Sequence, residues 1–205
     1  KRKLMKALYA VLFCVLLLGC GEQKEGDNKI YLPASNGNLN IISVVVDNQL
    51  WEGSVGESIR SIFAAPLNGL PVAEPLFSMR QIPPQVFDGF AARSRIVLKI
   101  EKRNAKPTTK IAKEAFAKPQ TIAVVVGKTD KDIIAQLEEN RDKIIDAFNK
   151  EEVKEKQRRI KLSLLTDEEM EKKLGFTINI PSVYRVSKSS DDFFWIRKNL
   201  SNSKT

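Results

Sequence analysis

The chain has 205 residues, with 34 basic and 25 acidic side chains, two cysteines and no histidine. Histidine is the most common general base near neutral pH and a common zinc ligand, so its absence excludes Ser-His-Asp and Cys-His catalysis. The positive excess is spread along the chain rather than gathered in a stripe with interleaved aromatic residues, so we expect no nucleic-acid partner.

Residues 1 to 19 have the composition of a signal peptide. A basic start precedes an apolar run from Ala7 to Leu18, and this order is typical of export signals. The run is shorter than the ~20 residues that a helix needs to cross a bilayer. The alternative is an ordinary secretory signal with a chance cysteine, which the lack of an Ala-x-Ala site disfavours.

The tetrapeptide Leu17-Leu18-Gly19-Cys20 resembles the lipobox of bacterial lipoproteins. The resemblance implies cleavage before Cys20 and diacylglycerol on its thiol, so that acyl chains hold the protein on a membrane without spanning it. Residue 21 is Gly rather than the Asp that favours the inner membrane in enterobacterial lipoproteins, which indicates the outer membrane. With Cys14 removed and Cys20 acylated, no thiol remains for a disulfide or for zinc.

The remainder of the chain is predicted to form a tether and one domain. Residues 20 to 32 are mostly polar and charged, so we expect a flexible tether. Residues 33 to 205 are predicted to fold as an α+β domain.

The first predicted elements of this domain are a strand and a helix. Residues 40 to 46 are apolar and β-branched, which indicates a buried strand. Apolar residues then recur at helical spacing from Trp51 to Phe63, with Asp47 or Asn48 placed to cap the helix. Glycines at 53 and 56 within this helix indicate close packing against a neighbour.

Prolines interrupt residues 67 to 90 and predict an extended, largely ordered connection. Strands are predicted at 94 to 100 and 121 to 126, followed by a long helix that Thr129 caps. Beyond Lys150 its apolar stripe thins, and Glu152/Lys156 and Glu155/Arg159 are spaced as i,i+4 ion pairs. We therefore expect that end of the helix to project into solvent.

The last predicted elements are a short helix and three strands. Thr166 and Glu169 have the spacing of a capping box for a helix that ends at Gly175. Strands are predicted at 176 to 180, 183 to 187 and 193 to 196. The last of these is the most aromatic run of the chain and only a polar tail follows it, so we expect the fold to be C-terminally incomplete, unless this strand is an inner one that closes the sheet.

The order strand, helix, strand, strand, helix, strand predicts a ferredoxin-like fold, in which helices cover one face of an antiparallel sheet. A larger mixed sheet is the alternative. One turn resembles a nucleotide-binding motif: Val126-Gly127-Lys128-Thr129 looks like the end of a P-loop, but Ile122 occupies the position of its first glycine. A strand-to-helix turn with a threonine cap is the preferred interpretation.

The densest pattern lies between Leu50 and Phe90. It includes Leu50-Trp51-Glu52-Gly53, Glu74-Pro75-Leu76-Phe77 and Gln81-Ile82-Pro83-Pro84, and it resembles an uncharacterised family of Bacteroidetes lipoproteins, a domain of unknown function. Val72 departs from that family's pattern, in which Gln follows the proline. The family implies no activity.

Six residues of this pattern are candidates for a polar groove with aromatic walls: Trp51, Arg60, Glu74, Phe77, Gln81 and Phe87. The competing and preferred interpretation is that they pack and brace the proline-rich connection, whose backbone groups need hydrogen-bond partners.

The sequence favours a non-catalytic envelope lipoprotein that binds an envelope protein or glycan, with no cofactor and no metal. The alternative is a hydrolase that acts on envelope glycan or peptide through carboxylates. A deep pocket with two carboxylates, one of them with a raised pKa, would favour the enzyme. A shallow apolar patch would favour the binding protein.

Overall fold

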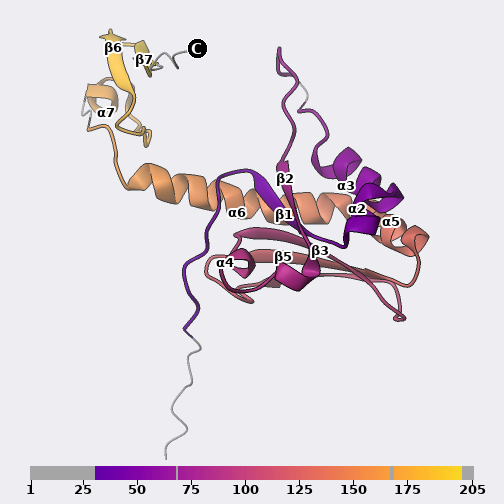
Figure 1. Cartoon of the computed structure of the whole chain (residues 1–205). Helices are drawn as coiled ribbons and strands as arrows, with labels where there is room; N and C mark the ends of the chain where they lie inside the picture. Colours follow the sequence, from indigo (N-terminus) through magenta and orange to yellow (C-terminus); the bar gives the residue numbers. More distant parts are fainter. Residues whose placement is uncertain (1–30, 68, 167–168, 200–205) are drawn as a thin grey trace, which may run out of the picture. The chain divides into compact units, whose positions relative to one another are not determined.

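A computed structural model of the chain describes residues 31–67, 69–166 and 169–199 (Figure 1). The chain divides into two units, Lys1–Tyr31 and Leu32–Thr205, and every helix and strand described below lies in the second. The predicted signal peptide and Cys20 lie outside the described residues. In the described part, no helix is long and apolar enough to span a membrane.

Five strands form the central sheet, in the order β2-β1-β3-β5-β4. These strands are β1 (Ile41–Val45), β2 (Ser78–Ile82), β3 (Ile96–Lys102), β4 (Thr108–Lys113) and β5 (Thr121–Gly127). The pairs β1–β2, β1–β3 and β3–β5 are parallel, and β4 is antiparallel to β5. The prediction of an α+β (α/β) domain with helices packed on a sheet is confirmed. The predicted ferredoxin-like antiparallel arrangement is not, because the sheet is mixed and mostly parallel.

Four helices cover one face of this sheet (Figure 1): α2 (Asn48–Glu52), α3 (Ser54–Phe63), α5 (Asp130–Glu139) and α6 (Arg141–Lys161). They bury the larger hydrophobic cluster, in which Phe63 and Phe77 both contact Phe148 at ring-centroid distances of 6.4 and 6.2 Å. Because side chains alternate along a strand, Val44 joins this cluster and Val45 joins a smaller one on the opposite face.

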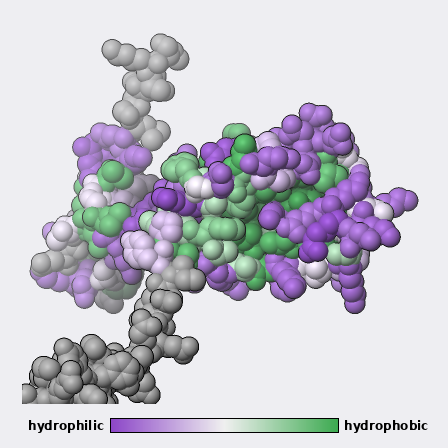
Figure 2. Space-filling view, turned by 60° about the horizontal axis from the view of Figure 1, so that its bottom comes forward, coloured by the Kyte–Doolittle hydropathy of each residue, from purple (hydrophilic) through white to green (hydrophobic). Residues whose placement is uncertain are grey.

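In the described part of the chain, the opposite face is covered by short segments, which include the 3₁₀ helix η2 (Pro84–Val86) and helix α4 (Gly89–Ala92). Phe87, between them, packs on the smaller cluster, while Val86 and Phe90 remain 56% and 72% exposed. Figure 2 looks toward the underside of the domain as drawn in Figure 1 and shows hydrophobic residues gathered between hydrophilic margins. The sheet is thus covered thickly on one face and thinly on the other.

The sequence predicts an extended, largely ordered connection from 67 to 90, and this prediction missed β2. The sequence pattern did not predict β4 either. Both strands lie at the edges of the sheet, and their sequences, SMRQI and TTKIAK, lack the apolar runs of the inner strands. An edge strand buries less of its surface, so its sequence carries a weaker strand pattern.

The predicted helix over residues 51 to 63 is divided at Gly53 into α2 and α3. A Cβ atom added to Gly56 would lie 2.6 Å from the backbone carbonyl carbon of Trp51, and its contact with Trp51 O would be shorter still. Only glycine fits where α3 approaches the backbone of α2, which confirms the close packing predicted from this residue.

The predicted long helix after Thr129 is also two helices, which meet at Asn140. Its expected solvent-exposed end is instead buried along one side, because Glu151, Glu152 and Glu155 are at most 5% exposed. Glu152 pairs with Arg95 rather than with Lys156, with 2.7 Å between Glu152 Oε1 and Arg95 Nε. Glu155 forms the predicted ion pair with Arg159.

The C-terminal segment contains α7 (Glu169–Leu174) and a separate two-stranded antiparallel sheet of β6 (Arg185–Ser189) and β7 (Phe194–Arg197). The helix ends before Gly175 as predicted, but residues 176 to 180 form no strand. Phe193 and Trp195 are 53% and 54% exposed. This aromatic run is therefore not an inner strand buried on both faces.

Candidate ligand-binding cleft

The strands β2, β1, β3 and β5 run in one direction, so their carboxyl ends meet at one edge of the sheet. The connections from β1 to β2 and from β2 to β3 pack on opposite faces, because α3 contributes to the larger cluster and Phe87 to the smaller. In open α/β sheets, ligands bind outside the carboxyl ends of the strands where the chain changes sides in this way.

A cavity of about 580 Å³ lies at this place. We call it the carboxyl-end cleft, and its lining residues are Asp47, Asn48, Gln49, Leu50, Pro83, Gln85, Lys102 and Asp130. They follow β1, follow β2, end β3 and begin α5. The volume lies in the range of ~300–1,000 Å³ that is usual for small-molecule sites.

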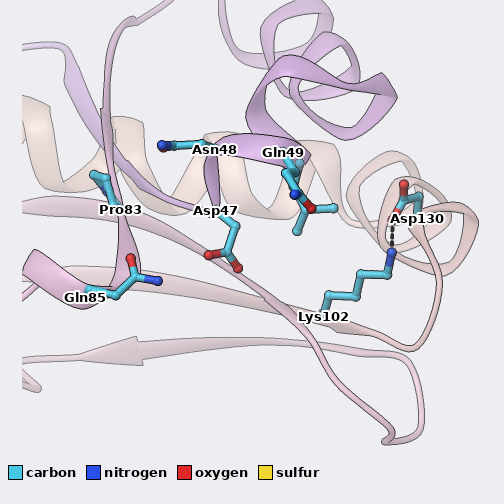
Figure 3. A pocket seen from close by; sticks show the side chains of 8 residues that line it. Asp47, Asn48, Gln49, Pro83, Gln85, Lys102 and Asp130 are labelled. Carbon is cyan, nitrogen blue, oxygen red and sulfur yellow. Dashed lines mark ion pairs between the residues drawn. The ribbon is translucent and has the colours of Figure 1, made fainter.

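Asp47 occupies the N-cap position of α2, but its side chain makes no capping hydrogen bond. Its carboxylate has no hydrogen-bond or ion-pair partner in the described part of the chain, and neither do the Gln49 and Gln85 side-chain amides. Figure 3 shows Asp47 between Gln85 on one side and Lys102 with Asp130 on the other. Polar groups free of protein partners therefore line the cleft.

Two further contacts shape its walls. Lys102 Nζ lies 2.8 Å from Asp130 Oδ1 and is the ion-pair partner of this oxygen (Figure 3). Both side chains are more than 40% exposed, so the pair stabilises the fold little and can rearrange around a ligand. On the other wall, Gln81 Nε2 donates to Asn48 Oδ1 at 2.7 Å and so fixes the Asn48 amide.

The turn after β5 is a capping box and confirms the preferred interpretation of the P-loop-like sequence. Thr129 Oγ1 accepts from Asp132 N at 3.2 Å, and Asp132 Oδ2 accepts from Thr129 N at 2.8 Å. These hydrogen bonds lower the pKa of Asp132, and the bond from the Thr129 backbone has the largest effect. The Asp132 carboxylate therefore takes the place near the helix N-terminus that a phosphate occupies in a P-loop.

The six candidate groove residues are distributed over the domain. Phe77 is fully buried in the larger cluster, whereas Phe87 lies on the opposite face, with its ring centroid 5.8 Å from that of Phe116. The two rings therefore do not wall one groove.

Trp51 and Arg60 do lie together. The Arg60 guanidinium carbon is 4.9 Å from the Trp51 ring centroid, and Arg60 Nη1 donates to Trp51 O at 3.1 Å. Glu74 is exposed. Gln81 belongs to β2 and reaches the carboxyl-end cleft through its bond to Asn48.

Sequence reasoning assigned Asp47 and Asn48 only to a helix cap and did not single out Gln49, Gln85, Lys102 or Asp130. Their common signal is a polar residue directly after, or at the end of, a predicted strand. That signal becomes informative only when the strands are known to be parallel.

The electrostatics of the cleft favour binding of a neutral polar group. Its lining carries two carboxylates and one ammonium group. Among the described residues, the carboxyl groups with a clearly lowered pKa are those of Glu101, Asp132, Glu151 and Glu155, and they lie outside the cleft. Among the described residues, no three carboxylates, thiols or imidazoles group as ligands for a metal ion.

The fold and the cleft define a mixed α/β domain with a polar cleft at the carboxyl ends of its parallel strands. Residues 35–161 match the model of a family described as Domain of unknown function (DUF8532), and the chain belongs to this family. Residues 163–205 match a second family, Domain of unknown function (DUF4837). No curated protein and no solved structure matches the chain.

Proposed function

We propose that this chain is a non-catalytic, lipid-anchored binding protein of the cell envelope that holds a neutral, hydroxyl-rich ligand, such as an envelope glycan, in the carboxyl-end cleft. The anchor is proposed at Cys20, in the outer membrane, on the resemblance of residues 17 to 20 to a lipobox and of the domain to Bacteroidetes lipoproteins. The observation that carries the ligand-binding part is the set of unpartnered polar side chains in that cleft.

The donor and acceptor groups of the cleft suit hydroxyl groups. The amides of Gln49 and Gln85 can each donate and accept, and the Asp47 carboxylate accepts. A sugar hydroxyl both donates and accepts, so it can bond to either kind of side chain. An anionic ligand suits the cleft less well, because Asp47 has no compensating cation and Lys102 is already paired with Asp130.

A carboxylate-dependent hydrolase remains the second candidate, because Asp47 and Asp130 line the same cavity. Binding is favoured over hydrolysis because Asp130 is already ion-paired with Lys102, which leaves Asp47 as the only lining carboxylate without a partner among the described residues.

The ligand-binding part is tested by calorimetric titration of the full-length protein with neutral oligosaccharides of glucose and of N-acetylglucosamine. Asp47→Asn and Gln85→Ala should each weaken binding by about tenfold. This is the effect of losing one hydrogen bond to a group that is charged or that the ligand buries. Asp88→Asn is the matched control, because Asp88 is also an exposed N-cap residue without a capping bond but lies outside the cleft.

Equal affinities for the Asp47 and Asp88 variants would contradict this site. If the protein cleaves the oligosaccharide and the Asp47→Asn variant does not, the hydrolase is supported instead.

The anchor is tested separately by replacing Cys20 with Ser. We expect the variant to be released from membranes or to retain residues 1 to 19, because the acyl chains need the thiol. Normal processing together with membrane retention would refute lipidation at this residue.

A further inference from the structure

We infer that the opposite end of the sheet carries a second binding site, an arginine-lined cleft for the phosphate or carboxylate group of a small anionic ligand. A cavity of about 500 Å³ lies beside the amino ends of β1, β2 and β3. We call it the amino-end cleft. Three arginines line it, Arg80, Arg95 and Arg159, together with the side chains of Ser43, Ser78 and Ser94.

These residues come to one place for reasons visible in the sheet. Arg80 of β2 is the register partner of Ser43 of β1, so both side chains emerge on the same face. Ser43 Oγ donates to Ser94 Oγ at 2.9 Å, which fixes the segment before β3 beside β1. Ser43 and Arg80 lie on the thinly covered face of the sheet, whereas Arg159 belongs to α6, so the cleft lies across the amino-end edge of the sheet.

Arg95 provides the fixed back of the cleft. It is 3% exposed, its Nε donates to Glu152 Oε1 at 2.7 Å and its Nη2 donates to Asn38 O at 2.8 Å. Its Nη1 donates to Gly37 O at 3.2 Å. Almost all of its hydrogen-bonding capacity is therefore used by the protein, and its role is to hold the wall in place.

Arg80 and Arg159 provide free donors. Arg159 uses Nε for Glu155 Oε1 and Nη2 for Gly37 O, at 2.7 and 2.9 Å, and the remaining N–H groups of its guanidinium are free. The Arg80 side chain has no hydrogen-bond or ion-pair partner in the described part of the chain, so all five of its N–H groups are available.

The charges around the amino-end cleft are unbalanced. Three guanidinium groups, those of Arg95, Arg158 and Arg159, share the two carboxylates of Glu152 and Glu155, and Arg80 has no ion-pair partner among the described residues. Both carboxylates are already bonded to arginines. The excess positive charge of the cleft therefore has no counter-charge in the described chain, and an anion would supply it.

The geometry of guanidinium narrows the ligand class. Its planar fork donates two parallel hydrogen bonds to a carboxylate or a phosphate, which an ammonium group cannot do. The Phe90 ring, 72% exposed on the lining, offers an apolar contact to the rest of the ligand. The site thus fits a small organic phosphate or a uronic acid and differs in charge from the carboxyl-end cleft.

The test is calorimetric titration of the full-length protein with inorganic phosphate and, separately, with glucuronate. We expect saturable binding of at least one probe below ~10 mM, weakened by salt because Arg80 is exposed. Arg80→Gln should reduce the affinity by at least about tenfold, and Arg80→Lys should restore it only in part, since lysine keeps the charge without the fork.

Arg93→Gln is the matched control. Arg93 is exposed and directly follows helix α4, whose Phe90 lines the cleft, but Arg93 itself does not line it. Asp47→Asn, in the other cleft, should also leave phosphate or glucuronate binding unchanged, which separates this inference from the proposed function. The proposal is overturned if neither probe binds below ~10 mM, or if Arg80→Gln and Arg93→Gln change the affinity equally. The probe that binds identifies the class of anionic group.

Discussion

Replacement of Gly56 by alanine tests the contact on which the α2–α3 corner depends. The added Cβ would lie 2.6 Å from Trp51 C and 2.9 Å from Trp51 Cα, where real Cβ atoms essentially never approach within 3.0 Å. These are backbone atoms, so no side-chain rotation relieves the overlap, and α3 must move away from α2. Val55 and Ile59, both fully buried, would move with it.

Two opposing effects set the size of the change. Alanine in a helix is favoured over glycine by ~1 kcal/mol, whereas insertion of a methyl group into a packed contact costs up to ~3 kcal/mol when the surroundings cannot yield. The net expectation is a loss of about 2 kcal/mol in the free energy of unfolding. With a urea m-value of ~2 kcal/mol/M, the unfolding midpoint should fall by about 1 M.

Urea unfolding followed by circular dichroism provides the assay, with Gly53→Ala as the control. At position 53 the nearest atom, Gln49 O, is 3.2 Å from the added Cβ, and φ is −94°. This variant should therefore lose less than ~1 kcal/mol. The reasoning is refuted if Gly56→Ala leaves the midpoint unchanged or raises it.

Three further predictions concern stability. Arg95→Gln should cost about 3–5 kcal/mol in urea unfolding, because it leaves the buried Glu152 carboxylate without its partner; a loss below ~1 kcal/mol would contradict this. Thr129→Ala should cost ~1 kcal/mol and Thr129→Ser much less, since serine preserves the cap. Hydrogen bonds from Arg158, which has the largest effect, and from Arg159 lower the pKa of Glu155 from 4.5 to about 2. The stability they provide is therefore present above pH 4.5 and lost as the pH falls toward 2, by about 1 kcal/mol between pH 5 and 3 after allowance for solvent screening of the exposed arginine. Glu155→Gln should abolish that part of the pH dependence, and an unchanged profile would count against it.

Local patterns in the sequence predicted the inner elements well. The runs at 40 to 46, 94 to 100 and 121 to 126 correspond closely to β1, β3 and β5. An inner parallel strand is apolar on both faces, so it forms a nearly continuous apolar run in the sequence. The breaks at Gly53 and Asn140 were missed because the apolar spacing continues through both.

The two candidate clefts were not predictable from local patterns. Lys102 and Asp130 read separately as a strand end and a helix start, and only the parallel register of β3 and β5 brings them together. Glu152 likewise has the spacing of a surface ion pair with Lys156, but the fold places Arg95 against it, from 57 residues earlier.

The sequence by itself determined the inner strands, the helix-capping role of Thr129 and the close packing at Gly56, because these depend on short-range hydrophobic patterns, hydrogen bonds and backbone sterics. Only the tertiary structure decided which strands are neighbours, which polar residues are buried and where the two clefts lie. These properties depend on contacts between residues far apart in the chain. The inner strands β1, β3 and β5 are parallel to one another, and the weakly patterned edge strand β4 is the one that makes the sheet mixed.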